Sequence, residues 1–129
     1  MAASDTIKAS VWEDAGATCL ARMVGNAGTS VTQASLTSIT CKVFDLSSAT
    51  PTTSIATPTV TISSAVYDTL QTDSRWTVDS TGYNFLFTVA ASILTTGDHR
   101  YRVEFKFTPT SGEVFFTVFE LYAQAVSTS

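Results

Sequence analysis

The chain has 129 residues, enough for one domain with a real hydrophobic core, and only 14% of them are charged, against roughly 25% in an average soluble domain. Seven Lys and Arg residues against eleven Asp and Glu residues give a formal net charge of −4, which argues against nucleic acid or an anionic membrane as the main partner. The apolar runs are too short to span a bilayer and the N-terminus lacks the features of a signal peptide, so we expect a protein made and folded in a cytoplasm.

The first part of the chain alternates apolar and polar residues over short stretches, which is typical of half-buried strands. Residues 11–16 predict the end of an edge strand followed by a turn, and residues 18–24 predict the next strand. Residues 25–28 are a strong turn signal, and residues 31–36 predict a short strand or a bent connection. A clear strand follows at residues 38–44.

The middle of the chain is rich in Ser, Thr and Pro. Residues 45–58 form a connection that is long for a compact domain, and such loops are usually functional or mobile. Short strands are expected at residues 59–63 and 64–70. Within residues 71–82, Trp76 either starts another short strand or closes one end of the core.

The last third contains the strongest strand patterns. Residues 83–89 alternate, and residues 99–107 do so with Arg100, Arg102, Glu104 and Lys106 on the solvent side. A Thr-Pro-Thr-Ser-Gly turn leads into a final strand that is apolar on both faces. One face carries Val114, Phe116, Val118 and Tyr122, and the other carries Phe115, Phe119 and Leu121.

Seven or eight short strands separated by turns, with no sustained helical periodicity, predict an all-β fold. We expect one antiparallel β-sandwich over residues 1–129, with a short N-terminal arm and a polar C-terminal tail. A small closed β-barrel is the alternative.

The two apolar faces of the final strand have two explanations. Either the long loop around Ile55 covers the second face, or that face packs against another chain. The low charge density favours the second explanation, because soluble monomers usually carry more charge. We therefore predict a protein–protein interface and a homo-oligomer or multi-copy assembly, with the interface formed by Phe115, Phe119, Leu121 and Ile55.

The sequence contains no recognisable catalytic signature. The single histidine, His99, has no obvious orienting partner, and Cys19 and Cys41 lack the spacing of a zinc site. We predict that both thiols are reduced and buried, since they lie on apolar strand faces. We also predict that the chain is not an enzyme and has no catalytic, metal-binding or cofactor-binding residues and no cofactor.

Four aromatic residues suggest a different role. Tyr67 and Trp76 are candidates for stacking on sugar rings, with Trp12 and Tyr122 as further candidates. A carbohydrate-binding module is therefore an alternative to a structural protein.

The C-terminal half resembles the last strands of immunoglobulin-like (Ig-like) domains, in which Gly-x-x-x-Tyr-x-Val opens the penultimate strand. Gly97, Tyr101 and Val103 match this motif, but the cysteine of antibody domains is missing from that strand. The resemblance therefore extends to the wider class of Ig-like sandwiches.

The chain also resembles small virion proteins of tailed bacteriophages and prophages, and its layout is similar to the N-terminal Ig-like domain of phage baseplate upper proteins. The stretches that carry this resemblance are Ala21-Arg-Met-Val-Gly-Asn, Lys42-Val-Phe-Asp-Leu and Thr69-Leu-Gln-Thr-Asp-Ser-Arg-Trp-Thr-Val-Asp. It implies a non-enzymatic structural role in the virion, most directly as a capsid decoration or cement protein, with a tail or baseplate component as the alternative. The implied partners are the major capsid protein or tail and baseplate proteins.

Overall fold

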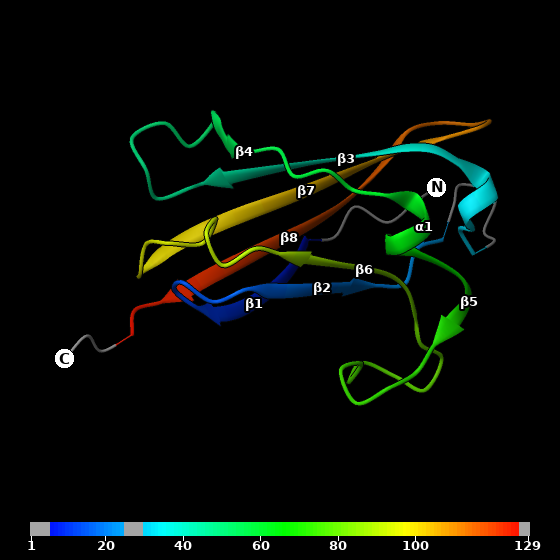
Figure 1. The fold of residues 1–129 in the computed structure, drawn as a ribbon, viewed down its shortest axis with the longest axis horizontal. Coiled ribbons are helices and arrows are strands. Elements are labelled where there is room, and N and C mark those ends of the chain that lie inside the picture. Colours follow the sequence, from blue (N-terminus) through cyan, green and yellow to red (C-terminus); the bar gives the residue numbers. More distant parts are fainter. Residues whose placement is uncertain (1–5, 25–29, 127–129) are drawn as a thin grey trace.

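The computed structural model describes residues 6–24 and 30–126 and consists mainly of β-strands (Figure 1). The eight strands are β1 (Thr6–Trp12), β2 (Ala17–Ala21), β3 (Leu36–Asp45), β4 (Ser54–Ala56), β5 (Val66–Gln71), β6 (Tyr83–Val89), β7 (His99–Pro109) and β8 (Phe115–Gln124). Two short helical turns are η1 (Gln33–Ser35) and α1 (Ile62–Ala65). The predicted turn at residues 25–28 and the start of the predicted N-terminal arm lie outside the described residues.

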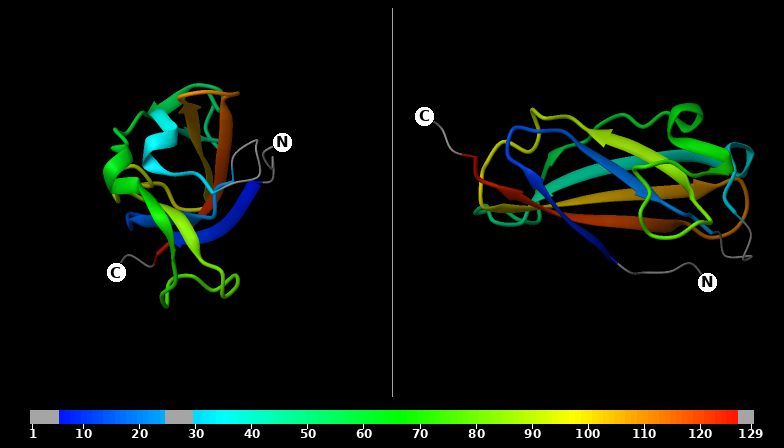
Figure 2. Two further views of the ribbon diagram at one scale, coloured as in Figure 1. Left: turned by 90° about the vertical axis from the view of Figure 1, so that its right-hand side faces the viewer. Right: turned by 90° about the horizontal axis from the view of Figure 1, so that it is seen from below.

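The strands form two sheets that pack face to face as two layers (Figure 2). Sheet A has the strand order β1-β8-β7-β3-β4, and sheet B has the order β2-β6-β5. The sheets do not close into a barrel. The prediction of an Ig-like β-sandwich is therefore confirmed, and the barrel alternative is not.

One strand pair departs from the predicted antiparallel arrangement. β1 runs parallel to β8, with Ile7 opposite Phe119 and Val11 opposite Ala123. All other paired strands in the described part of the chain are antiparallel. A parallel pair cannot be joined by a hairpin. This pairing therefore brings the first and the last described strands side by side.

The core lies between the sheets because alternate residues of each strand face inward. On β7, Tyr101, Val103, Phe105 and Phe107 are each at most 1% exposed, as the alternation predicts. Aromatic rings join the two layers: the Phe85 ring centroid of sheet B lies 4.8 Å from that of Phe105 and 5.4 Å from that of Phe107.

The segments that link the sheets differ from the prediction. The structure places η1 within residues 31–36, and the short strand expected at residues 59–63 is absent, with α1 starting at Ile62. Only Thr59 makes an isolated bridge, to Thr40, before α1 carries the chain from sheet A to sheet B. Trp76 lies in a loop rather than in a strand.

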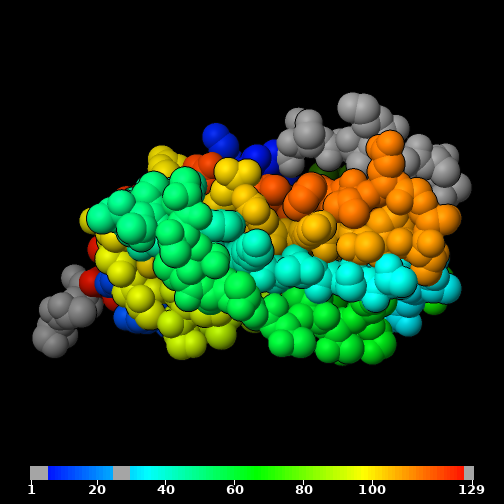
Figure 3. All heavy atoms as spheres, turned by 90° about the horizontal axis from the view of Figure 1, so that it is seen from above, coloured from blue at the N-terminus to red at the C-terminus, as the bar shows by residue number. Residues whose placement is uncertain are grey.

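The long Ser/Thr/Pro-rich connection forms an edge of sheet A. Its residues Ser54–Ala56 pair with β3 as strand β4. Figure 3 shows this connection (blue-green) near one end of the molecule, while the turn between β7 and β8 (orange) lies at the other end. The connection therefore lies beside β3 and does not cover β8.

Both cysteine side chains are buried and unpaired, as predicted. Cys19 belongs to sheet B and Cys41 to sheet A, so their strands are not hydrogen-bonded neighbours. Burial raises the pKa of each thiol to about 12, and the nearby Cys41 adds to the effect on Cys19. The thiols are therefore held in their unreactive protonated form at neutral pH.

Tyr101 forms a link at the start of β7 that is typical of Ig-like domains. Its ring is 1% exposed, and its hydroxyl accepts a hydrogen bond of 3.0 Å from the backbone N–H of Thr96. A tyrosine near the start of this strand, bonded to the backbone a few residues upstream, is the tyrosine corner. Val103, two residues later, faces the core where antibody domains have a cysteine.

Replacing Tyr101 by Phe should lower the free energy of unfolding by about 1–2 kcal/mol, because the Thr96 N–H loses its partner in a partly buried site. Urea denaturation measures this change. Tyr122→Phe is the matched control, since its hydroxyl bonds to the exposed Asp98. An equal loss in the two variants would show that the Tyr101 hydroxyl has no special structural role.

Candidate functional site: an apolar hollow

An apolar hollow of about 350 Å³ lies between the two sheets at one side of the sandwich. It is bounded by β2, by the start of β8 and by the loop before β6. Most of its surface comes from apolar side chains, among them Ile7, Val24, Trp76, Val78, Phe115 and Phe116. A concave apolar surface of this kind is suited to receive an apolar side chain or loop.

The rim of the hollow is exposed to solvent. Phe116 is 50% exposed, Val78 is 73% exposed and Val24 is 42% exposed. Phe116 points outward because it pairs with Lys106, which lies on the solvent side of β7. The side of β8 that carries Phe116 is therefore the side that faces solvent.

This arrangement corrects the predicted interface. Phe115, Phe119 and Leu121 are 8%, 3% and 3% exposed and belong to the domain's own core. They pair with Phe107, Val103 and Tyr101, the inward residues of β7, and cross-strand partners share a face. β8 does carry two apolar faces, but the exposed face is the opposite one. Of these three residues, only Phe115 reaches the hollow.

Ile55, the fourth residue of the predicted interface, is 48% exposed on β4. Two strands, β7 and β3, separate β4 from β8 in sheet A. Ile55 therefore neither joins the other three residues nor covers the second face of β8.

The loop before β6 packs against the buried ring of Tyr83. The Tyr67 ring meets Tyr83 edge-on at 6.0 Å between centroids, and the Trp76 ring lies tilted at 5.7 Å. The indole N–H of Trp76 donates to Asp79 at 2.9 Å. The two predicted sugar-stacking residues thus come together, but they pack against the protein's own tyrosine. Trp76 is also a wall of the hollow.

Polar contacts hold this loop in place. The Tyr83 hydroxyl donates to Asp73 at 2.6 Å, and Arg75 forms an ion pair of 3.0 Å with the same carboxylate. Asp79 accepts hydrogen bonds from the N–H groups of Trp76, Thr81 and Gly82, and it forms an ion pair of 2.8 Å with Arg22, which directly follows β2.

These contacts lower the pKa of both carboxyl groups. Hydrogen bonds from Arg75 and then Tyr83 lower the pKa of Asp73 from 3.8 to about 2. The Trp76 indole, the Gly82 backbone and Arg22 hold the pKa of Asp79 well below its usual range. The two carboxylates therefore remain charged in moderately acidic solution and keep the wall of the hollow in place.

The sequence indicated Trp76 and Phe115 as site residues, but not Phe116, Val78 or Arg22. Phe116 could not be chosen from the sequence, because both faces of the final strand are apolar and its register with β7 decides which face is exposed. Val78 carries no such signal, because the loop that brings it to the hollow has no periodic pattern. Arg22 directly follows β2, and its place at the hollow depends on its ion pair with the distant Asp79.

His99 has a partner that the sequence did not reveal. Its Nδ1 lies 2.8 Å from the carboxylate of Asp45, which is only 8% exposed. The pair links the end of β3 to the start of β7. Among residues 6–24 and 30–126, no cluster of three or more His, Cys, Asp and Glu residues could hold a metal ion.

Comparisons of the chain with protein-family models, with curated proteins and with solved structures found no match. In the described part of the chain, no helix is long and apolar enough to cross a membrane.

Acid titration tests how the loop is held. Because the pKa of Asp73 is lower in the folded chain than in the unfolded one, its stabilising contribution is complete above about pH 4 and is lost as the pH falls toward about 2. In a Trp12→Phe background, the emission of Trp76 should stay constant from neutral pH to about pH 3 and change below that value. Asp79→Asn should move this change to higher pH, whereas Asp68→Asn should not. A midpoint near pH 4 in the parent chain would contradict the assignment.

Proposed function

We propose that this chain is a non-enzymatic structural protein of a tailed-phage virion, where it decorates or cements the capsid through protein–protein contacts. The observation that carries the proposal is the apolar hollow with its exposed rim of Phe116, Val78 and Val24. Contiguous exposed apolar surface marks interaction sites in soluble proteins. The virion itself is inferred from the resemblance of the sequence stretches quoted above.

The proposed occupant of the hollow is an apolar side chain or loop of a neighbouring virion subunit, with the major capsid protein as the first candidate. Burying an exposed ring such as that of Phe116 contributes about 25 cal/mol for each Å² removed from water. A stable interface covers about 800 Å² on each partner, so the contact must extend from the hollow onto the neighbouring sheet face. Many copies on a symmetric shell would strengthen binding through avidity.

The same surface would serve a tail or baseplate component. The sandwich does not distinguish these locations, because the chemistry of an apolar anchor is the same in each. Binding to purified capsids and to purified tails, measured separately, distinguishes them.

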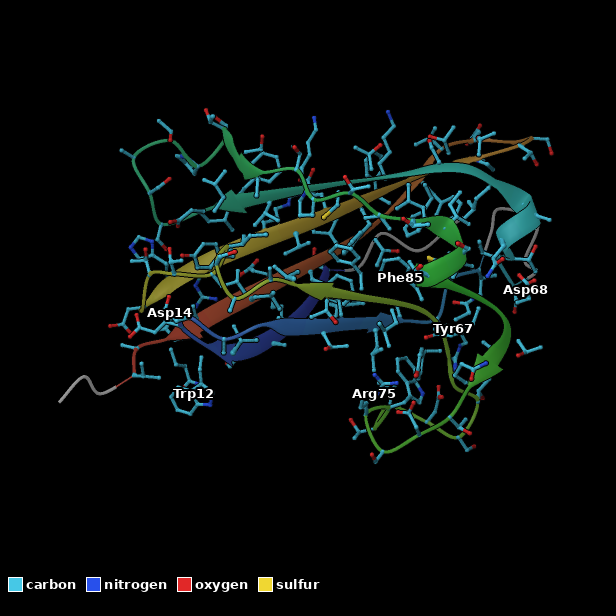
Figure 4. The ribbon with its side chains drawn as sticks, in the orientation of Figure 1. Trp12, Asp14, Tyr67, Asp68, Arg75 and Phe85 are labelled. Carbon is cyan, nitrogen blue, oxygen red and sulfur yellow. The ribbon has the colours of Figure 1, made fainter. Side chains whose placement is uncertain are left out.

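A second candidate function is glycan recognition, favoured by the indole of Trp12, which is 55% exposed on the edge strand β1. Trp12 lies at the opposite end of the molecule from Tyr67 (Figure 4), so the predicted aromatic residues do not form one platform. Glycan-array binding that is lost in Trp12→Ala would favour this function, and an array without signal would count against it.

Replacing Phe116 by Asp should weaken binding to virion particles at least about tenfold, because a charge then occupies the apolar anchor point. Co-sedimentation with capsids lacking the chain, and with tails, measures the effect. The change should leave folding intact, since Phe116 is half exposed, and circular dichroism checks this point.

Ile55→Asp is the matched control, because Ile55 is equally exposed but lies on β4, outside the hollow. Binding that survives Phe116→Asp, or that is weakened to the same degree by Ile55→Asp, would rule out the hollow as the contact site.

A further inference from the structure

The outer face of sheet A gathers most of the positive charge of the chain. Five of the seven Lys and Arg residues lie there, together with two glutamates, so the face has a net charge of +3 in a chain of net charge −4. We call this surface the cationic face, and its charged residues are Lys8, Lys42, Arg100, Arg102, Glu104, Lys106 and Glu120.

The strand register places these side chains on one surface. Lys8 lies opposite Glu120, which lies opposite Arg102, and Lys42 lies opposite Glu104. Cross-strand partners project from the same side of a sheet. Three shallow hollows on this side, of about 240, 290 and 280 Å³, are lined by these residues, so the face is open to a partner.

The positive charge of the cationic face is only partly neutralised. Arg100 pairs with Glu120 at 3.2 Å, and Arg102 pairs with Glu104 at 2.9 Å. Lys8, Lys42 and Lys106 form no ion pair within the described residues. The surplus charge therefore resides on three exposed lysines.

An opposite surplus lies at one end of the sandwich. Glu13 and Asp14 form the turn after β1, and Asp98 precedes β7, which meets β8 at the same end. Figure 4 shows Asp14 at this end. None of the three carboxylates has an ion-pair partner among residues 6–24 and 30–126. We call these three residues, with a combined charge of −3, the acidic end.

We propose that the cationic face of one copy binds the acidic end of a second copy. Equal and opposite surpluses of three charges favour this pairing, whereas face-to-face or end-to-end contacts would oppose like charges. Such a head-to-tail contact is heterologous, so it can continue from copy to copy into a ring or an open array. The inference rests on the proposed structural role and names the self-contact within that assembly.

The test uses two variants in which charge is removed with little change of shape. The face variant carries Lys8→Gln, Lys42→Gln and Lys106→Gln. The end variant carries Glu13→Gln, Asp14→Asn and Asp98→Asn, which keep the hydrogen bonds from Val126 N–H and the Tyr122 hydroxyl possible. Asn also suits the positive φ of 57° at Asp14 and 61° at Asp98.

Light scattering on the wild-type chain at about 10 mM salt should show a mass that rises above 13.7 kDa with concentration and returns to the monomer at about 1 M salt, where charges are screened within about 3 Å. Each variant alone should remain monomeric. A mixture of the two should form a one-to-one dimer and nothing larger, because only one intact face and one intact end remain. Asp68→Asn with Glu113→Gln removes charge elsewhere and should associate like the wild type.

A wild-type chain that stays monomeric at low salt, or a variant mixture that does not associate, would overturn the proposal. Binding of the wild-type chain to a DNA duplex that is lost in the face variant would overturn it in favour of a nucleic-acid partner. Binding to capsids through Phe116 is measured separately. Capsid binding without self-association would leave the proposed function standing, and self-association without capsid binding would leave only the self-contact standing.

Discussion

The packing of Phe85 between Phe105 and Phe107 is the contact on which the rest of the structure depends, because it joins the two sheets through the centre of the core. Phe105 also meets Phe119 at 5.8 Å, and Phe107 stacks on Phe115 at 5.0 Å, so β8 is fixed to the same cluster. Once these rings face inward, the residues that alternate with them along β7 and β8 must face outward. The exposed position of Phe116 and the solvent side of Arg100, Arg102 and Lys106 follow from this one constraint.

The strand order then decides which outward residues become neighbours. β1 pairs with β8 and β3 pairs with β7, so Lys8 and Lys42 join the charged side of β7 although they are distant in the sequence. The same order leaves β2 and β6 in the other layer, which creates the hollow at the side where the layers meet. The apolar hollow and the cationic face share Phe116, so one continuous surface offers both an apolar anchor and a charged surround.

The loop before β6 supplies part of the wall of the hollow. It has no regular structure, yet Asp73, Arg75 and Asp79 hold it against Tyr83 and Arg22 and so position Trp76 and Val78 at the hollow. Because these contacts already hold the loop, the proposed binding at the hollow would lose little entropy in ordering it. The surplus of cations on one face and the three carboxylates at one end, which have no ion-pair partner among the described residues, support the proposed contact between copies in a fixed orientation.

The sequence by itself determined the sandwich class, the strands with strong alternation and the buried thiols, because a period of two reports directly on which residues share a face. It also showed that the last strand is apolar on both sides. Only the tertiary structure decided which side is exposed, since that depends on the register between β8 and β7, and Phe115, Phe119 and Leu121 proved to be core residues. The parallel pairing of β1, the partner of His99 and the position of Lys8 and Lys42 beside the cations of β7 were likewise beyond sequence patterns, because each depends on contacts between distant strands that no local period encodes.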